Sequence, residues 1–278
     1  MNTVALQPTK PIIGAADLIY EGISRYLQCM ASLPQHCRGV APRYEANAEA
    51  WVLFRQIIRH VEAITELAKN DLVLLPPALA LARVAFEITT RILWMLHPDE
   101  VFDREARFLA HLASEEEYWG RSAALLEEFG YDGKHWQEQR DRVRRFRTAV
   151  EELLPPGTNR VTAIPNFRAM LKEIGDELRY GHYIRLSQFS HGSHAAGGIY
   201  RKGLGGGKMV KEFVYPESWA EPLSCAWWCI AMGGCAILRR LGDDPARFLS
   251  KELFDKVEEA LNKVRNAKTQ ANTAAHPW

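Results

Sequence analysis

Apolar side chains recur along most of the chain at intervals of three and four residues, the spacing of helices that bury one face. Segments with this pattern cover residues 15–32, 45–69, 99–129, 135–154, 166–174 and 243–267. Neither a convincing period-two alternation nor an internal repeat interrupts them. The pattern therefore predicts an all-α fold, with eight or nine helices in a single bundle-like domain.

Two further segments, residues 76–96 and 216–241, are apolar almost all round and open on proline. Such helices are typical of the centre of a bundle. The longest apolar run, Leu223–Leu238, has 16 residues with two adjacent glycines, and charged residues flank it. That length is short for a bilayer span, so we expect a buried helix and no membrane association.

The segment Asp176–His194 predicts one more helix, with an ordered set of polar residues. At about 100° per residue, Tyr183, Ser187, His191 and His194 fall within about 80° of one another. Polar groups under cover have to be hydrogen-bonded. This stripe is expected either to fix the register of the helix or to form a site in which His191 acts as an acid or base.

The apolar helix at 76–96 carries three charges, Arg83, Glu87 and Arg91, spaced four residues apart. Burying charges is costly unless partners are supplied. Two interpretations stay open: an ion-pair network that supports packing, or an anion clamp with a positioned carboxylate. Arginines of the segment 140–147 likewise form either a solvated face or a phosphate contact.

Glycines break the helical pattern after His194, and residues 194–215 predict a long Gly-rich basic loop with a short β-ribbon at 209–215. Its Gly203–Lys208 stretch has three residues between the first glycine and the G-K pair, where a P-loop has four, and no Ser or Thr follows. A P-loop is excluded. Arg201 and Lys208 can still touch an anion as part of a lid.

Composition and cysteine spacing further restrict the compartment and the kind of site that we expect. The chain has 278 residues, a net charge of +1 and five cysteines without a C-x-x-C motif, as expected of reduced thiols in a cytoplasmic protein. We expect a flexible lead over 1–12, one helical domain over 13–267 and a tail over 268–278. His191 and His194 could share a metal, but neither H-E-x-x-H nor paired E-x-x-H motifs occur, so no metal and no cofactor is predicted.

An R-x-x-x-E helix (Arg83, Glu87) followed by a Y-x-x-L-S-x-x-x-H helix (Tyr183 to His191) resembles an uncharacterised bacterial helical family known as a domain of unknown function. The resemblance covers roughly Glu45–Gly198. It implies an all-helical fold and no established reaction.

Arg185 and His191, with five residues between them, also resemble the signature of the HEPN superfamily of helical nucleases and nucleotide-binding proteins. That resemblance implies metal-independent RNA cleavage near a dimer interface, where Arg185 binds the phosphate and His191 handles the 2′-hydroxyl proton. Two departures stand out. Leu186 replaces the usual polar residue, and on an unbroken helix the pair lies about 120° apart.

Three functions follow from these patterns. The first is a HEPN-like endoribonuclease or toxin in phage defence, with candidate catalytic residues Arg185, His191, Ser187, Glu87 and Arg83. The second is a helical sensor or binding module for a small anionic ligand, with candidate binding residues Tyr183, His194, Arg91, Arg201 and Lys208. The third is a structural interaction subunit. The expected partners are RNA or a small anion, together with a second copy of the chain or another protein.

Overall fold

The computed structural model describes residues 6–40, 43–191, 193–197, 199, 201–202, 209–210 and 214–267. The α-helices are α1 (Lys10–Ala31), α2 (Gln35–Arg38), α3 (Glu45–Asn70), α4 (Leu75–Leu96), α5 (Val101–Glu128), α6 (Lys134–Leu153), α7 (Phe167–Glu173), α8 (Tyr180–Ser190), α9 (His194–Gly197), α10 (Ala220–Leu241) and α11 (Lys251–Arg265). Two short strands, β1 (Arg201–Lys202) and β2 (Met209–Val210), pair antiparallel. Because α2 and α9 have only four residues each, the predicted all-α bundle is confirmed with nine longer helices in the described part.

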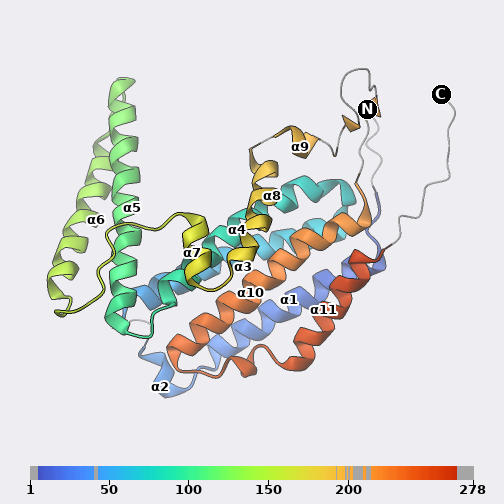
Figure 1. The fold of residues 1–278 in the computed structure, drawn as a ribbon, viewed down its shortest axis with the longest axis horizontal. Coiled ribbons are helices and arrows are strands. Elements are labelled where there is room, and N and C mark those ends of the chain that lie inside the picture. The colour runs from blue at the N-terminus through green and yellow to red at the C-terminus, as the bar shows by residue number, and fades with distance from the viewer. Residues whose placement is uncertain are drawn as a thin grey trace.

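The body of the molecule is formed by α1, α3, α4, α10 and α11, which lie side by side along its long axis (Figure 1). Two glycines let α10 approach its neighbours closely. A Cβ atom on Gly233 would lie 2.6 Å from the Phe54 ring, and one on Gly234 would lie 2.9 Å from the Phe248 ring. The segments 72–96 and 216–241 are long and apolar enough to span a membrane, and 44% and 72% of their most apolar windows are buried inside the protein.

The C-terminal end of α4 is held by three arginines from neighbouring helices. Its carbonyl groups are unpaired within the helix and carry the negative end of the helix dipole, so guanidinium donors stabilise them. The bonds run from Arg107 Nη1 to the Trp94 oxygen (2.5 Å), from Arg240 Nε to the Leu96 oxygen (2.9 Å) and from Arg104 Nη1 to the Pro98 oxygen (2.8 Å). This clamp joins the first turns of α5 and the end of α10 to α4.

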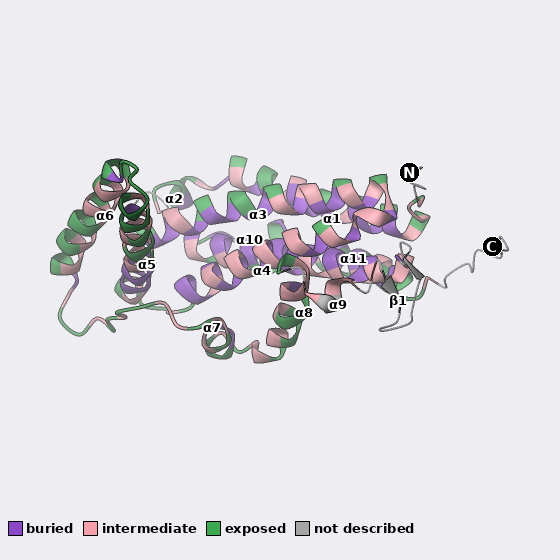
Figure 2. Cartoon of the chain, turned by 90° about the horizontal axis from the view of Figure 1, so that it is seen from above, coloured by how far each residue is buried: buried purple, intermediate pink, exposed green. Residues whose placement is uncertain are grey.

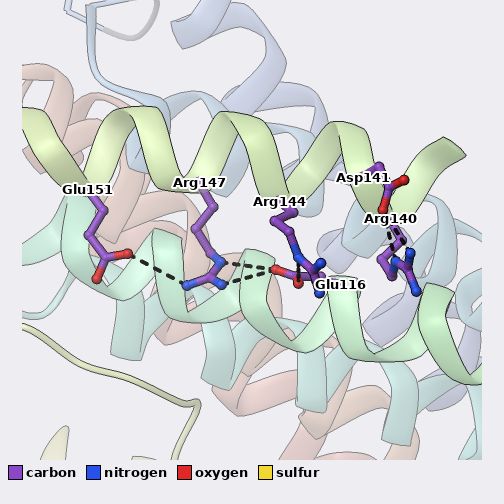
Figure 3. Close-up of polar contacts among 6 residues, drawn as sticks. All are labelled: Glu116, Arg140, Asp141, Arg144, Arg147 and Glu151. Carbon is purple, nitrogen blue, oxygen red and sulfur yellow. Dashed lines mark hydrogen bonds and ion pairs between the residues drawn. The ribbon is translucent and has the colours of Figure 1, made fainter. Parts of the chain in front are cut away.

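Helices α5 and α6 form an antiparallel hairpin that stands away from the body (Figures 1 and 2). Buried residues of α5 are confined to the run Arg104–His111 and to Ala123, and α6 has none. We call residues 112–153 the arm. Inside it Glu116 accepts hydrogen bonds from Arg144 (2.6 Å) and Arg147 (3.1 Å), as Figure 3 shows. Two arginines of the basic segment 140–147 therefore hold α6 against α5.

Several predicted boundaries are corrected. Helix α1 begins at Lys10, inside the expected flexible lead, and the Leu6 amide donates to Asp71 Oδ1 at 2.9 Å. The described part of the lead thus packs on the body. Helix α5 takes Glu100 as its N-cap residue and begins at Val101, two residues after the predicted start of the segment 99–129. The expected tail, 268–278, lies outside the described residues.

The predicted helix over 176–194 is also wrong as one element. A 3₁₀ turn (Glu177–Arg179) precedes α8, and α8 ends with His191 as its C-cap residue. Serine hydroxyls near this end bond to the backbone of their own helix: Ser187 Oγ donates to the Tyr183 carbonyl (2.7 Å) and Ser190 Oγ to the Ser187 carbonyl (3.1 Å). Such bonds compete with helix propagation, and a glycine follows in the sequence.

Candidate functional site

Helix α8 lies across α4 and is anchored by Leu186, its buried residue (Figure 1). A first polar cluster joins the two helices. Arg83 of α4 pairs with Glu87 Oε1 (2.9 Å) and donates to Ser190 Oγ of α8 (2.8 Å). Its guanidinium also lies 5.5 Å from the centroid of the Tyr183 ring. We call these four residues the α4 cluster.

Within the α4 cluster, neighbouring groups already engage most of the Arg83 guanidinium. Its side chain is 16% exposed and makes an ion pair, a hydrogen bond and a cation–π contact. Tyr183 in turn stacks on Phe167 at 4.2 Å between ring centroids. Farther along α4, the Nε of Arg91 is buried without a hydrogen-bond partner among the described residues. The arrangement of the α4 cluster is that of a clamp that fixes α8 on α4.

A cavity of about 440 Å³ lies among α4, α8 and α10. This volume falls within the range of small-molecule sites. Its wall is apolar and includes Leu75, Leu79, Phe86, Leu186, Phe189, Ile199 and Trp228. Its charged rim consists of Arg179, His182, Arg185, Glu217, Glu221 and Arg265. We call this set the cavity rim.

The centre of the cavity rim is a three-residue contact. Arg185 Nε donates to Glu221 Oε1 at 2.8 Å, and Arg185 Nη2 lies 2.9 Å from His182 Nδ1. Because a guanidinium only donates, Nδ1 accepts in this bond, and a neutral ring carries its proton on Nε2. Burial lowers the pKa of His182, and the charge of Arg185 lowers it further. At neutral pH His182 is therefore an uncharged donor.

The other rim arginines are positioned by their surroundings. Arg179 donates to Asp176 Oδ2 (2.7 Å), and its guanidinium lies 4.8 Å from the centroid of the Trp228 ring. Arg265 Nη2 donates to Ser224 Oγ (2.9 Å). Three arginines and two glutamates thus line the rim, and each arginine has a carboxylate nearby: Asp176 for Arg179, Glu221 for Arg185 and Glu258 (3.9 Å) for Arg265.

The thiol of Cys225 also lines the cavity and is held in its protonated form. Its Sγ donates to the Ala82 carbonyl at 3.4 Å. A hydrogen bond with Cys229, together with burial, raises its pKa well above the ordinary value. This thiol is therefore not arranged as a nucleophile.

The predicted site residues divide among different environments. Arg185 lies in the cavity rim, whereas Arg83, Glu87 and Tyr183 belong to the α4 cluster. His191 is exposed, and among the described residues its side chain has no hydrogen bond or ion pair. The described contacts do not join Arg185 to His191, so the ribonuclease pair stays a prediction. The side chains of His194, Arg201 and Lys208 lie outside the described part of the chain.

Sequence analysis did not connect Arg179, His182 and Glu221 with Arg185. His182 precedes Arg185 by three residues, which puts the two about 60° apart on one face of α8, and that spacing was the available signal. Arg179 precedes Arg185 by six residues and lies in the 3₁₀ turn before α8, so spacing did not place it beside Arg185. Glu221 comes from the first turn of α10 and could not be assigned to this face from spacing alone. In the described ranges, no group of three or more His, Cys, Asp or Glu side chains is arranged to hold a metal.

Comparison with known families identifies the chain at a coarse level. The model of a family of unknown function, DUF5677, matches residues 50–201, more than half of the 278 residues. The chain belongs to DUF5677. The predicted membership of an uncharacterised helical family is thereby confirmed, and the HEPN resemblance stays a prediction. In this DUF5677 member the matched region contains the α4 cluster and Arg185 but ends before Glu221. No curated protein and no solved structure matches the chain.

Proposed function

We propose that this DUF5677 protein is a binding module for a small amphipathic anion, which it holds in the cavity among α4, α8 and α10. The observation that carries the proposal is the pairing of an apolar wall with a rim of three arginines and a neutral histidine. Small-molecule sites are typically apolar with a few convergent polar groups. The guanidinium donors that line the cavity favour an anionic group over a cationic one.

The binding mode follows from the donors that are still available. Arg185 uses Nε and Nη2 for Glu221 and His182, so its Nη1 donors are without a partner among the described residues. Nη1 can donate to a carboxylate, sulfonate or phosphate group. The apolar part of the ligand would then lie along Leu186 and Trp228.

Two observations favour binding over turnover. The Ser187 hydroxyl is bonded to its own helix, and the Cys225 thiol is protonated and bonded to a carbonyl. A nucleophile needs an adjacent base to activate it. The ribonuclease hypothesis rests instead on Arg185 and His191, and its test is separate.

The binding proposal can be tested with anilinonaphthalene sulfonate, an aromatic anion that fluoresces when bound in apolar surroundings. Decanoate should displace it, whereas decanol and acetate should not, because each lacks one half of the required chemistry. Arg185→Gln should weaken binding about tenfold, the effect of losing one charged hydrogen bond. The matched control is Arg168→Gln, which removes an arginine of similar exposure that pairs with Glu177 away from this cavity. Equal binding by wild type and Arg185→Gln would refute the proposal.

A further inference from the structure

Several large apolar side chains are exposed on both helices of the arm. Six of them are between 40% and 79% exposed. Tyr131 lies at the tip, and the other five are Tyr118, Leu125 and Phe129 of the α5 side, and Phe146 and Leu153 of α6. Clusters of exposed apolar residues on otherwise charged helices mark interaction surfaces. In the described structure nothing covers these residues.

The exposed residues fall on one face of the hairpin. At about 100° per residue, Tyr118, Leu125 and Phe129 lie within about 40° of one another, and Phe146 and Leu153 lie within about 20°. The contacts of Glu116 with Arg147 and of Trp119 with Trp136 (4.9 Å) fix how the two helices face each other.

In this antiparallel arrangement both apolar groups project to the same side. The opposite side carries charged residues that include Glu117, Glu128 and Asp141. We call the apolar side the arm face. It has the amphipathic character of a helix pair that packs on another helix pair.

The two helices of the arm differ in charge. The α5 portion, residues 112–128, has five acidic residues and one arginine, a net charge of −4. Helix α6 has six basic and four acidic residues, a net charge of +2. Arg142 and Arg145 of α6 are exposed and have no ion pair among the described residues. A partner for α6 would therefore be acidic, and a partner for α5 would be basic.

We propose that the arm face binds the arm face of a second copy of this chain. In the resulting four-helix bundle, α5 of each copy lies beside α6 of the other, around a two-fold axis parallel to the helices. This pairing puts acidic helices against basic ones at every contact. The alternative two-fold arrangement stacks α5 on α5 and α6 on α6, which brings like charges together.

The shape of the molecule permits this arrangement. Figure 2 shows that the body extends from the α5 side of the arm, away from α6. When α5 of one copy lies over α6 of the other, the two bodies point in opposite directions and do not collide.

The area of the arm face is sufficient for a dimer. Twenty residues of helix span about 30 Å, and two packed helices are about 20 Å wide, which gives roughly 600 Å² per copy. The total of about 1,200 Å² reaches the lower end of stable interfaces. This dimer is independent of the ligand proposed for the cavity.

Light scattering coupled to gel filtration tests the dimer. Across a concentration series, the wild-type chain should show twice the 31.6 kDa mass of one copy at the upper end. Leu125→Glu combined with Leu153→Glu should halve that mass without changing the circular dichroism spectrum, because both side chains are more than half exposed. Leu178→Glu, at a 95% exposed position outside the arm, should leave the dimer intact. A monomeric wild type, or a double variant that stays dimeric, would overturn the proposal.

Cross-linking tests the direction of pairing. Tyr131 lies at the tip between α5 and α6, and the proposed axis brings the two tips together. Tyr131→Cys should be joined into a covalent dimer by a short bismaleimide, and the Leu125→Glu, Leu153→Glu background should abolish the product. The native thiols are buried or half-buried and offer little competition. A dimeric variant that does not cross-link would rule out tips at the same end.

Discussion

The two sides of α8 carry similar residues and put them to different uses. On one side, Arg83 bonds to Glu87 and, across a helix–helix contact, to Ser190, while its Nε is buried without a hydrogen-bond partner among the described residues. On the other side, Arg185, His182 and Glu221 also bond to one another but line a cavity of about 440 Å³. The types of residue alone therefore do not distinguish a contact that holds two helices together from a binding site. What separates them is whether donors remain directed at an accessible volume.

The largest expected effect concerns the α4 cluster. Arg83→Ala would leave the half-buried Glu87 without its ion pair and Ser190 Oγ without its donor, at a cost of about 2 kcal/mol in the free energy of unfolding. Urea denaturation would measure it. The folded fraction should bind the sulfonate probe as wild type does. A loss of binding without a loss of stability would reverse the roles assigned to the two sides.

A smaller effect, a gain in affinity for the probe, is expected when the charge of Glu221 is removed. This carboxylate competes with an incoming anion for Arg185, and it also repels that anion. Glu221→Gln should therefore tighten probe binding by about fivefold, equivalent to about 1 kcal/mol. Isothermal titration would detect the change. Glu177→Gln, which removes the carboxylate of the Arg168 pair, is the control and should have no effect on affinity.

The third effect is a dependence of probe affinity on pH. His182 has a lowered pKa in the empty protein, and a bound anion would raise it again by favouring the charged ring. Binding then takes up a proton, so affinity should rise a few-fold as the pH falls below about 6.5. A sulfonate probe keeps its own charge over this range. His182→Gln should give a flat profile, and an unchanged slope in that variant would assign the proton to another group.

The same shift has a consequence for stability, with its own sign. Since the folded pKa lies below the unfolded value of about 6.5, the unfolded chain binds the proton more readily. The contribution of His182 to folding is thus intact above about pH 6.5. It declines as the pH falls through the folded pKa, and thermal melts at several pH values, compared with His182→Gln, would report it.

The smallest expected effect belongs to His191. Its side chain is exposed, so His191→Ala should change the free energy of unfolding by less than about 0.5 kcal/mol and leave probe binding unchanged. The variant also decides the ribonuclease hypothesis. Metal-independent cleavage of RNA by the wild type that disappears in His191→Ala would establish a nuclease; equal behaviour of both proteins toward RNA would end that hypothesis.

The fold was largely predictable because apolar periodicity reports directly on which face of a helix is buried. The central positions of α4 and α10 followed from their nearly uniform apolarity. The end of α8 was missed because serine hydroxyls bonded to backbone carbonyls look, in a sequence, like ordinary helical positions. The cavity rim was only half foreseen. Spacing can place Arg185 beside His182, but the position of Glu221 depends on tertiary packing.

The clamp at the end of α4 has a mechanical consequence. Arg104 and Arg107 belong to the root of α5, and Arg107 also bonds Glu173 of α7. Any swivel of the hairpin about its root must break several charged hydrogen bonds at once. The hairpin formed by α5 and α6 therefore keeps one orientation relative to the body of the protein. X-ray scattering in solution should record a single well-defined maximum dimension.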